Sequence, residues 1–92
     1  MGRHTDALTI FHQVGEIFIS EYGVTSSYVA GWMNNCALCY AGLGQLQQAA
    51  NAFQSSLRTY ENLTPFPAVN YANTLENLAT VRLVARCLFF FL

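Results

Sequence analysis

The sequence predicts an all-α fold built from repeated helix pairs, and three observations lead to this prediction. Apolar residues recur at spacings of three and four along most of the chain, which is the period of an amphipathic helix. No segment shows the alternation of apolar and polar residues, bounded by turns, that indicates a strand. The chain also matches a shifted copy of itself, and its 92 residues suffice for one domain.

The first two helices are predicted over residues 5–22 and 27–41. The first carries one apolar stripe, formed by Ala7, Leu8, Ile10, Phe11, Val14, Ile17 and Phe18. Gly23 follows it and can adopt the left-handed backbone conformation that ends many helices. Either Ser26 or Ser27 then provides the side-chain oxygen that caps the start of the second helix.

The third and fourth helices are predicted over residues 45–62 and 68–87. A tight turn at Gly42–Gly44 separates the second helix from the third. The third helix must end before Pro65 and Pro67, because a proline donates no helical hydrogen bond and disfavours helix in the residue before it.

A shift of 42 residues aligns the chain with itself at small, polar and aromatic positions. The identical pairs are Gly2 with Gly44, Ala7 with Ala49, Phe11 with Phe53, Ala30 with Ala72, Asn35 with Asn77, Ala37 with Ala79 and Leu46 with Leu88. Apolar positions also coincide, as in Phe18 with Tyr60 and Cys36 with Leu78. The first and third helices are therefore equivalent, and so are the second and fourth.

The segment Met33-Asn34-Asn35-Cys36-Ala37-Leu38-Cys39-Tyr40, followed by Gly44, Ala49 and Phe53, resembles the tetratricopeptide repeat. The Asn pair and the 42-residue period are most similar to the long repeats of kinesin light chains. The resemblance implies a right-handed α–α superhelix of antiparallel helix pairs, about two repeats over a single domain 1–92. It also implies that Ala37 and Ala79 lie where two helices cross closely. The pattern departs at Arg82 and Arg86, and residues 86–92 form an apolar C-terminal tail outside it.

In this family the first helix of each repeat lines a concave groove that binds peptides. By the match, the groove residues are Asn34, Asn35, Leu38, Asn73, Glu76, Asn77 and Thr80. An Asn side chain both donates and accepts hydrogen bonds, which suits an extended peptide backbone. The resemblance therefore implies a scaffold or adaptor that binds a protein or peptide ligand, although a solvated polar face explains these residues equally well.

Composition argues against several other classes of function. The chain is 53% hydrophobic and 10% charged with a net charge of −1, and its four cations are scattered arginines. Nucleic-acid binders need clustered positive charge, so we expect no nucleic-acid partner. We expect no membrane span, because arginines interrupt the apolar end of the chain. No carboxylate pair, nucleophile motif or phosphate-binding loop is present, so we predict no catalytic residues and no cofactor.

The cysteines leave one alternative open. Cys36, Cys39 and Cys87 indicate free thiols in a reducing compartment, and we therefore expect a cytoplasmic protein. Cys36 and Cys39 fall in the middle of a predicted helix, where the repeat has apolar residues, so we expect both to be buried and metal-free. A protein with metal-binding or redox-active thiols remains the less favoured alternative.

A structural or oligomerising role is the other alternative. Each repeat in a stack buries its apolar faces only against the adjacent repeats, and about three repeats are usually needed for stability. A stack of about two has apolar ends, which favours a longer array or self-association through those ends. This alternative predicts dimers whose population depends on concentration.

Overall fold

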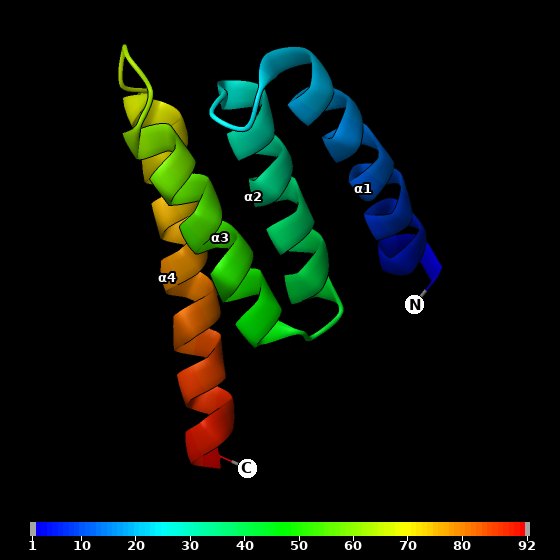
Figure 1. The fold of residues 1–92 in the computed structure, drawn as a ribbon. Coiled ribbons are helices and arrows are strands. Elements are labelled where there is room, and N and C mark those ends of the chain that lie inside the picture. The colour runs from blue at the N-terminus through cyan, green and yellow to red at the C-terminus, as the bar shows by residue number, and fades with distance from the viewer. Residues whose placement is uncertain (1, 92) are drawn as a thin grey trace.

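The computed structural model describes residues 2–91 as four helices joined by short connections. They are α1 (Gly2–Tyr22), α2 (Ser27–Gly42), α3 (Leu46–Glu61) and α4 (Ala68–Phe91). No strand occurs in this part of the chain. Figure 1 shows consecutive helices running in opposite directions, so the prediction of an all-α fold of antiparallel helix pairs is confirmed.

Two helix ends differ from the sequence-based predictions. α1 begins at Gly2 rather than at residue 5, and α4 continues to Phe91 rather than to residue 87. The apolar tail is therefore part of α4 up to Phe91, and Leu92 lies outside the described residues. α4 is longer than predicted because neither Gly nor Pro follows Ala85, and extending an existing helix costs far less than starting one.

Glycine and serine set the turns as the sequence predicts. Gly23 and Gly44 have φ angles of 84° and 79°, a conformation that glycine adopts without steric cost. The Oγ atom of Ser26 accepts a hydrogen bond of 3.1 Å from the backbone N–H of Val29, which caps α2. These turns make α1, α2 and α3 fold back on one another.

α1 packs against α2 through aromatic residues. Tyr22 stacks on Tyr28 with ring centroids 4.3 Å apart, and Phe18 lies beside both rings. Further along, the indole N–H of Trp32 donates to the backbone carbonyl of Phe11. A Cβ atom at Gly15 would overlap the Trp32 ring, so this glycine makes room for the indole.

The core forms around α3, which packs on α2 at one side and on α4 at the other. Its buried cluster draws residues from all three helices: Ala37, Ala49, Phe53, Leu57, Leu78 and Val81. Ser56 is also buried, and its hydroxyl donates a 2.7 Å hydrogen bond to the carbonyl of Ala30. A buried hydroxyl is tolerated here because its hydrogen bond replaces the lost contact with water.

The two equivalent alanines differ in their surroundings. Ala37 is fully buried in the core, as the repeat pattern predicts. Ala79 is exposed, so the prediction of a close helix crossing there is wrong within this chain. The reason is that α3 covers Ala37, whereas no helix follows α4 in the described residues to cover Ala79.

The helices form a thin array, with principal extents of 43 × 29 × 15 Å. α1 lies at one end of the row and α4 at the other, and the last turns of α4 extend beyond the neighbouring helices (Figure 1). α2 and α4 also touch directly. Among residues 2–91, no helix combines the length and the hydropathy that a membrane crossing requires.

Candidate functional site

The seven residues predicted to bind a peptide come together on two neighbouring helices. α2 carries three of them and α4 carries four, and we call this set the α2–α4 face: Asn34, Asn35, Leu38, Asn73, Glu76, Asn77 and Thr80. Within each helix these residues are three or four apart or adjacent, so each set lies along one side of its helix. The face therefore spans the line where α2 and α4 meet.

One hydrogen bond joins the two halves of the face. The side-chain amide of Asn77 donates to the side-chain oxygen of Asn34 at 3.3 Å. Both residues are half-buried, whereas Asn35, the sequence equivalent of Asn77, is exposed. Asn35 and Asn77 occupy equivalent positions in the repeat but have different surroundings, because Asn77 faces the neighbouring helix α2.

The remaining residues of the α2–α4 face are open to solvent. Asn35, Asn73 and Glu76 are exposed, and the Leu38 side chain is 47% exposed. Thr80 is also exposed, but its hydroxyl donates to the backbone carbonyl of Glu76 at 3.0 Å. The face thus offers amide groups that can donate and accept, one carboxylate and one apolar side chain.

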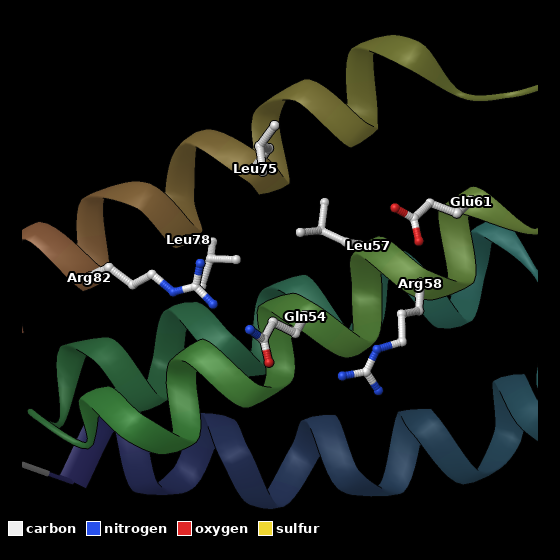
Figure 2. Close-up of a pocket in the computed structure, with 7 residues that line it drawn as sticks. All are labelled: Gln54, Leu57, Arg58, Glu61, Leu75, Leu78 and Arg82. Carbon is white, nitrogen blue, oxygen red and sulfur yellow. The ribbon is translucent and has the colours of Figure 1, made fainter.

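A second feature lies between α3 and α4, on a different side of α4. It is an open hollow of about 310 Å³, which we call the α3–α4 hollow, lined by Gln54, Leu57, Arg58, Glu61, Leu75, Leu78 and Arg82. Figure 2 shows Leu57 and Leu78 between the helices and Leu75 on α4, with Arg82 toward one end and Arg58 and Glu61 toward the other. The surface is therefore apolar in the middle and charged at its ends.

The glutamate at this hollow is already engaged. The hydroxyl of Tyr71 donates to Glu61 at 2.7 Å, which joins the start of α4 to the end of α3. This hydrogen bond raises the pKa of Tyr71, since ionising the tyrosine would lose the donor and place two negative charges together. Arg58 and Arg82 remain exposed and available to anionic groups.

The three thiols have different surroundings. Cys36 is buried, Cys39 is half-buried and Cys87 is exposed, so the expectation that both Cys36 and Cys39 are buried holds fully only for Cys36. Burial, followed by the neighbouring Cys39, raises the pKa of Cys36 to about 11. Among the side chains that the structure describes, no three His, Cys, Asp or Glu residues converge in a way that would hold a metal ion.

The sequence predicts the α2–α4 face but misses the α3–α4 hollow. Leu57 and Leu78 belong to recognisable apolar stripes, and the repeat pattern marks Arg82 as a departure. The hollow could have been found only by noticing that Arg82 on the fourth helix and Arg58 on the third helix lie at the same surface. This requires knowledge of which helix faces lie side by side, and a one-dimensional pattern does not contain it.

Comparison with known proteins identifies the kind of repeat. A sequence model described as the tetratricopeptide repeat matches residues 1–62, which include α1, α2 and α3. No curated protein and no solved structure matches the chain. The match covers the residues that carry the Asn34–Asn35 pair and the buried core around Phe53.

Proposed function

The chain belongs to the tetratricopeptide repeat family, and from this premise we propose that it is a non-catalytic adaptor for an extended peptide segment of a protein partner. The α2–α4 face is the proposed binding surface. The observation that carries the proposal is the hydrogen bond from Asn77 to Asn34, which joins two helices that each present exposed polar groups beside it.

The chemistry of the α2–α4 face suits an extended backbone. An extended peptide presents N–H and C=O groups alternately, and each Asn amide satisfies both kinds. Asn35 and Asn73 are exposed and make no side-chain hydrogen bond within the described residues, so they are free for a ligand. Leu38 adds an apolar contact, and Glu76 favours a ligand with a positive charge.

The amides have two different roles in this proposal. Asn34 and Asn77 bind each other and hold α2 against α4, so they position the surface. Asn35 and Asn73 are the contact residues. A hydrogen bond to a neutral backbone group contributes about 0.5–1.5 kcal/mol net, so two such contacts give only part of a modest affinity.

A titration tests the proposal. Peptides enriched from a displayed random library against the purified chain are titrated into wild type and into the Asn35→Ala/Asn73→Ala variant. Loss of two hydrogen bonds should weaken binding roughly ten- to a hundredfold. Thermal stability should stay unchanged, because both side chains are exposed.

The matched control is Asn51→Ala, which removes an exposed amide from α3, outside the α2–α4 face. This variant should bind the same peptides as wild type does. Equal affinity of wild type and the double variant would show that peptides bind elsewhere, and failure to enrich any peptide would argue against an adaptor of this kind. Adding Asn77→Ala should weaken binding further and reduce stability slightly, since it also breaks the link between α2 and α4.

Two finer features belong to the same proposal. The repeats are of the long type that resembles kinesin light chains, which the burial of both Cys36 and Leu78, 42 positions apart, supports. The protein works in a reducing compartment such as the cytoplasm, because its three cysteines are free. No contact among the described residues favours the alternative of a metal-binding or redox-active thiol protein. The alternative of self-association has specific support at the two ends of the array.

A further inference from the structure

The two end helices each leave one side uncovered. α1 packs on α2 alone, and its Ile17 side chain is 59% exposed. α4 packs on α3 and touches α2, but it leaves Leu75, at the edge of the α3–α4 hollow, 47% exposed and Ala79 open to solvent. Figure 1 places these two helices at opposite ends of the row. The chain therefore has an unpaired apolar helix face at each end.

The repeat relates the two ends to each other. The 42-residue shift makes α1 equivalent to α3 and α4 equivalent to α2. α2 is flanked by two helices, α1 and α3, whereas α4 has only the counterpart of the first of these, α3. The missing neighbour of α4 is thus a helix of the type to which α1 itself belongs.

Contacts inside the chain show which residues would meet. Ala37 on α2 is buried beside Ala49 and Phe53 of α3, and these correspond to Ala79 on α4 and to Ala7 and Phe11 of α1. Another contact joins Thr59 of α3 to Met33 of α2, with Thr59 Oγ1 3.8 Å from Met33 Sδ. Its counterparts are Ile17 on α1 and Leu75 on α4. Both are exposed apolar side chains, so the transferred contact pairs two surfaces that are now in water.

The charges of the two ends are complementary. α1 carries three exposed acids, Asp6, Glu16 and Glu21, against one exposed cation, Arg3. The α4 end carries the exposed cations Arg58, Arg82 and Arg86. Of the two acids at the α4 end, Glu61 is bound by Tyr71 and Glu76 lies on the α2–α4 face. The shift places Glu16 of an added α1 at the position equivalent to Arg58 of α3, and it directs Asp6 toward the end of α4 that carries Arg82 and Arg86. Such exposed pairs set orientation more than affinity.

From these observations we propose that a second copy of this chain docks head-to-tail, with its α1 on the outer side of α4 and beside the α3–α4 hollow. The added helix runs parallel to α3 and antiparallel to α4, as α3 does relative to α1 and α2. Its Ile17 covers Leu75, and its Ala7 packs against Ala79. The contact joins two different surfaces, so each copy leaves a free α1 and a free α4, and the assembly grows as an open stack.

Mass measurements over a range of concentrations give the first test. Light scattering and sedimentation of the wild-type chain should show a weight-average mass that rises with concentration beyond that of a dimer. A chain that stays monomeric at millimolar concentration would overturn the proposal. A mass that stops at the dimer would also overturn it, because it would indicate a contact between two like ends.

Blocking one end at a time gives the sharper test. Ile17→Asp blocks the α1 surface and Ala79→Arg blocks the α4 surface, and both positions are exposed within one chain, so each variant should fold. Each variant alone should be monomeric, whereas an equimolar mixture should form a one-to-one dimer through the two intact surfaces. A mixture that stays monomeric, or a single variant that still assembles, would contradict head-to-tail docking.

Val69→Asp is the matched control. Val69 is an exposed apolar residue of α4, and its equivalent on α2, Ser27, stays exposed although α2 has a helix on both sides. The docked α1 therefore should not cover Val69, and this variant should assemble as wild type does. Circular dichroism of all three variants should give the helix content of wild type.

Self-association and peptide binding are separable. The docking surfaces are the outer side of α4 and the uncovered side of α1, whereas the proposed peptide contacts are Asn35 and Asn73. Ile17→Asp should therefore abolish assembly and leave the affinity for library-selected peptides unchanged. Conversely, Asn35→Ala/Asn73→Ala should weaken peptide binding and leave the concentration dependence of the mass unchanged.

Discussion

Helices α1 and α3 carry equivalent residues but differ greatly in burial. Ala49, Phe53 and Tyr60 of α3 are buried. Their counterparts in α1 are Ala7, Phe11 and Phe18, and all three are only half-buried. α3 has a helix on each side, whereas α1 has only α2.

This difference shows how a repeat fold distributes its stability. Each repeat contacts only its neighbours, so the same residue contributes more in the middle of a stack than at its end. The sequence pattern defines an apolar position, and the number of neighbouring helices decides how much water that position loses. α3 is therefore the centre of stability in this chain, and α1 is an edge.

The largest expected effect distinguishes the two equivalent phenylalanines. Phe53→Ala should lower the free energy of unfolding by about 3–5 kcal/mol, because it leaves a cavity in the buried core. Phe11→Ala should cost only about 1–2 kcal/mol, because that ring is already half in water. Urea denaturation at low micromolar concentration measures both. Equal costs would show that α1 is packed as tightly as α3.

The next effect compares the two alanines of the repeat. Ala37→Leu should cost about 1–3 kcal/mol, because the larger side chain does not fit where α2 meets α3. Ala79→Leu is the matched control and should change stability by no more than about 0.5 kcal/mol in the monomer, because Ala79 is exposed. Thermal melting of both variants measures this. A neutral Ala37→Leu would mean that the repeat register is wrong.

The smallest effect concerns the thiols and leaves the fold intact. At pH 8 a thiol reagent should modify the exposed Cys87 rapidly and the buried Cys36 slowly. Two causes act together at Cys36, since its burial restricts access and its pKa of about 11 leaves little thiolate. The slow phase should disappear in Cys36→Ala. Rapid modification of all three thiols in the native protein would show that α2 does not pack on α3 as described.

The raised pKa of Cys36 also predicts a dependence of stability on pH. The unfolded chain ionises this thiol near its ordinary value of 9.0, whereas the folded chain keeps the proton up to about pH 11. The contribution is therefore fully present below pH 9 and is lost as the pH rises through 11. Denaturation of wild type and Cys36→Ala across this range should show a steeper alkaline loss in wild type. Parallel curves would contradict the burial of the thiol.

The sequence by itself determined the local structure of this protein. Helical periodicity and the turns at Gly23 and Gly44 depend on residues close together in the chain, and so does the break before Pro67. The repeat pattern also marked Ala37 as a position where two helices cross closely, and the structure buries Ala37 in the core.

Only the tertiary structure decided which equivalent positions differ. Ala79 is exposed while Ala37 is buried, and Asn77 bonds Asn34 while Asn35 faces solvent. It also brought Arg58 and Arg82 to one hollow, although they lie on separate helices. The physical reason is that burial and pairing depend on which helix lies alongside. A repeat pattern gives the same residue at two equivalent positions, but it does not show whether a neighbouring helix covers both of them.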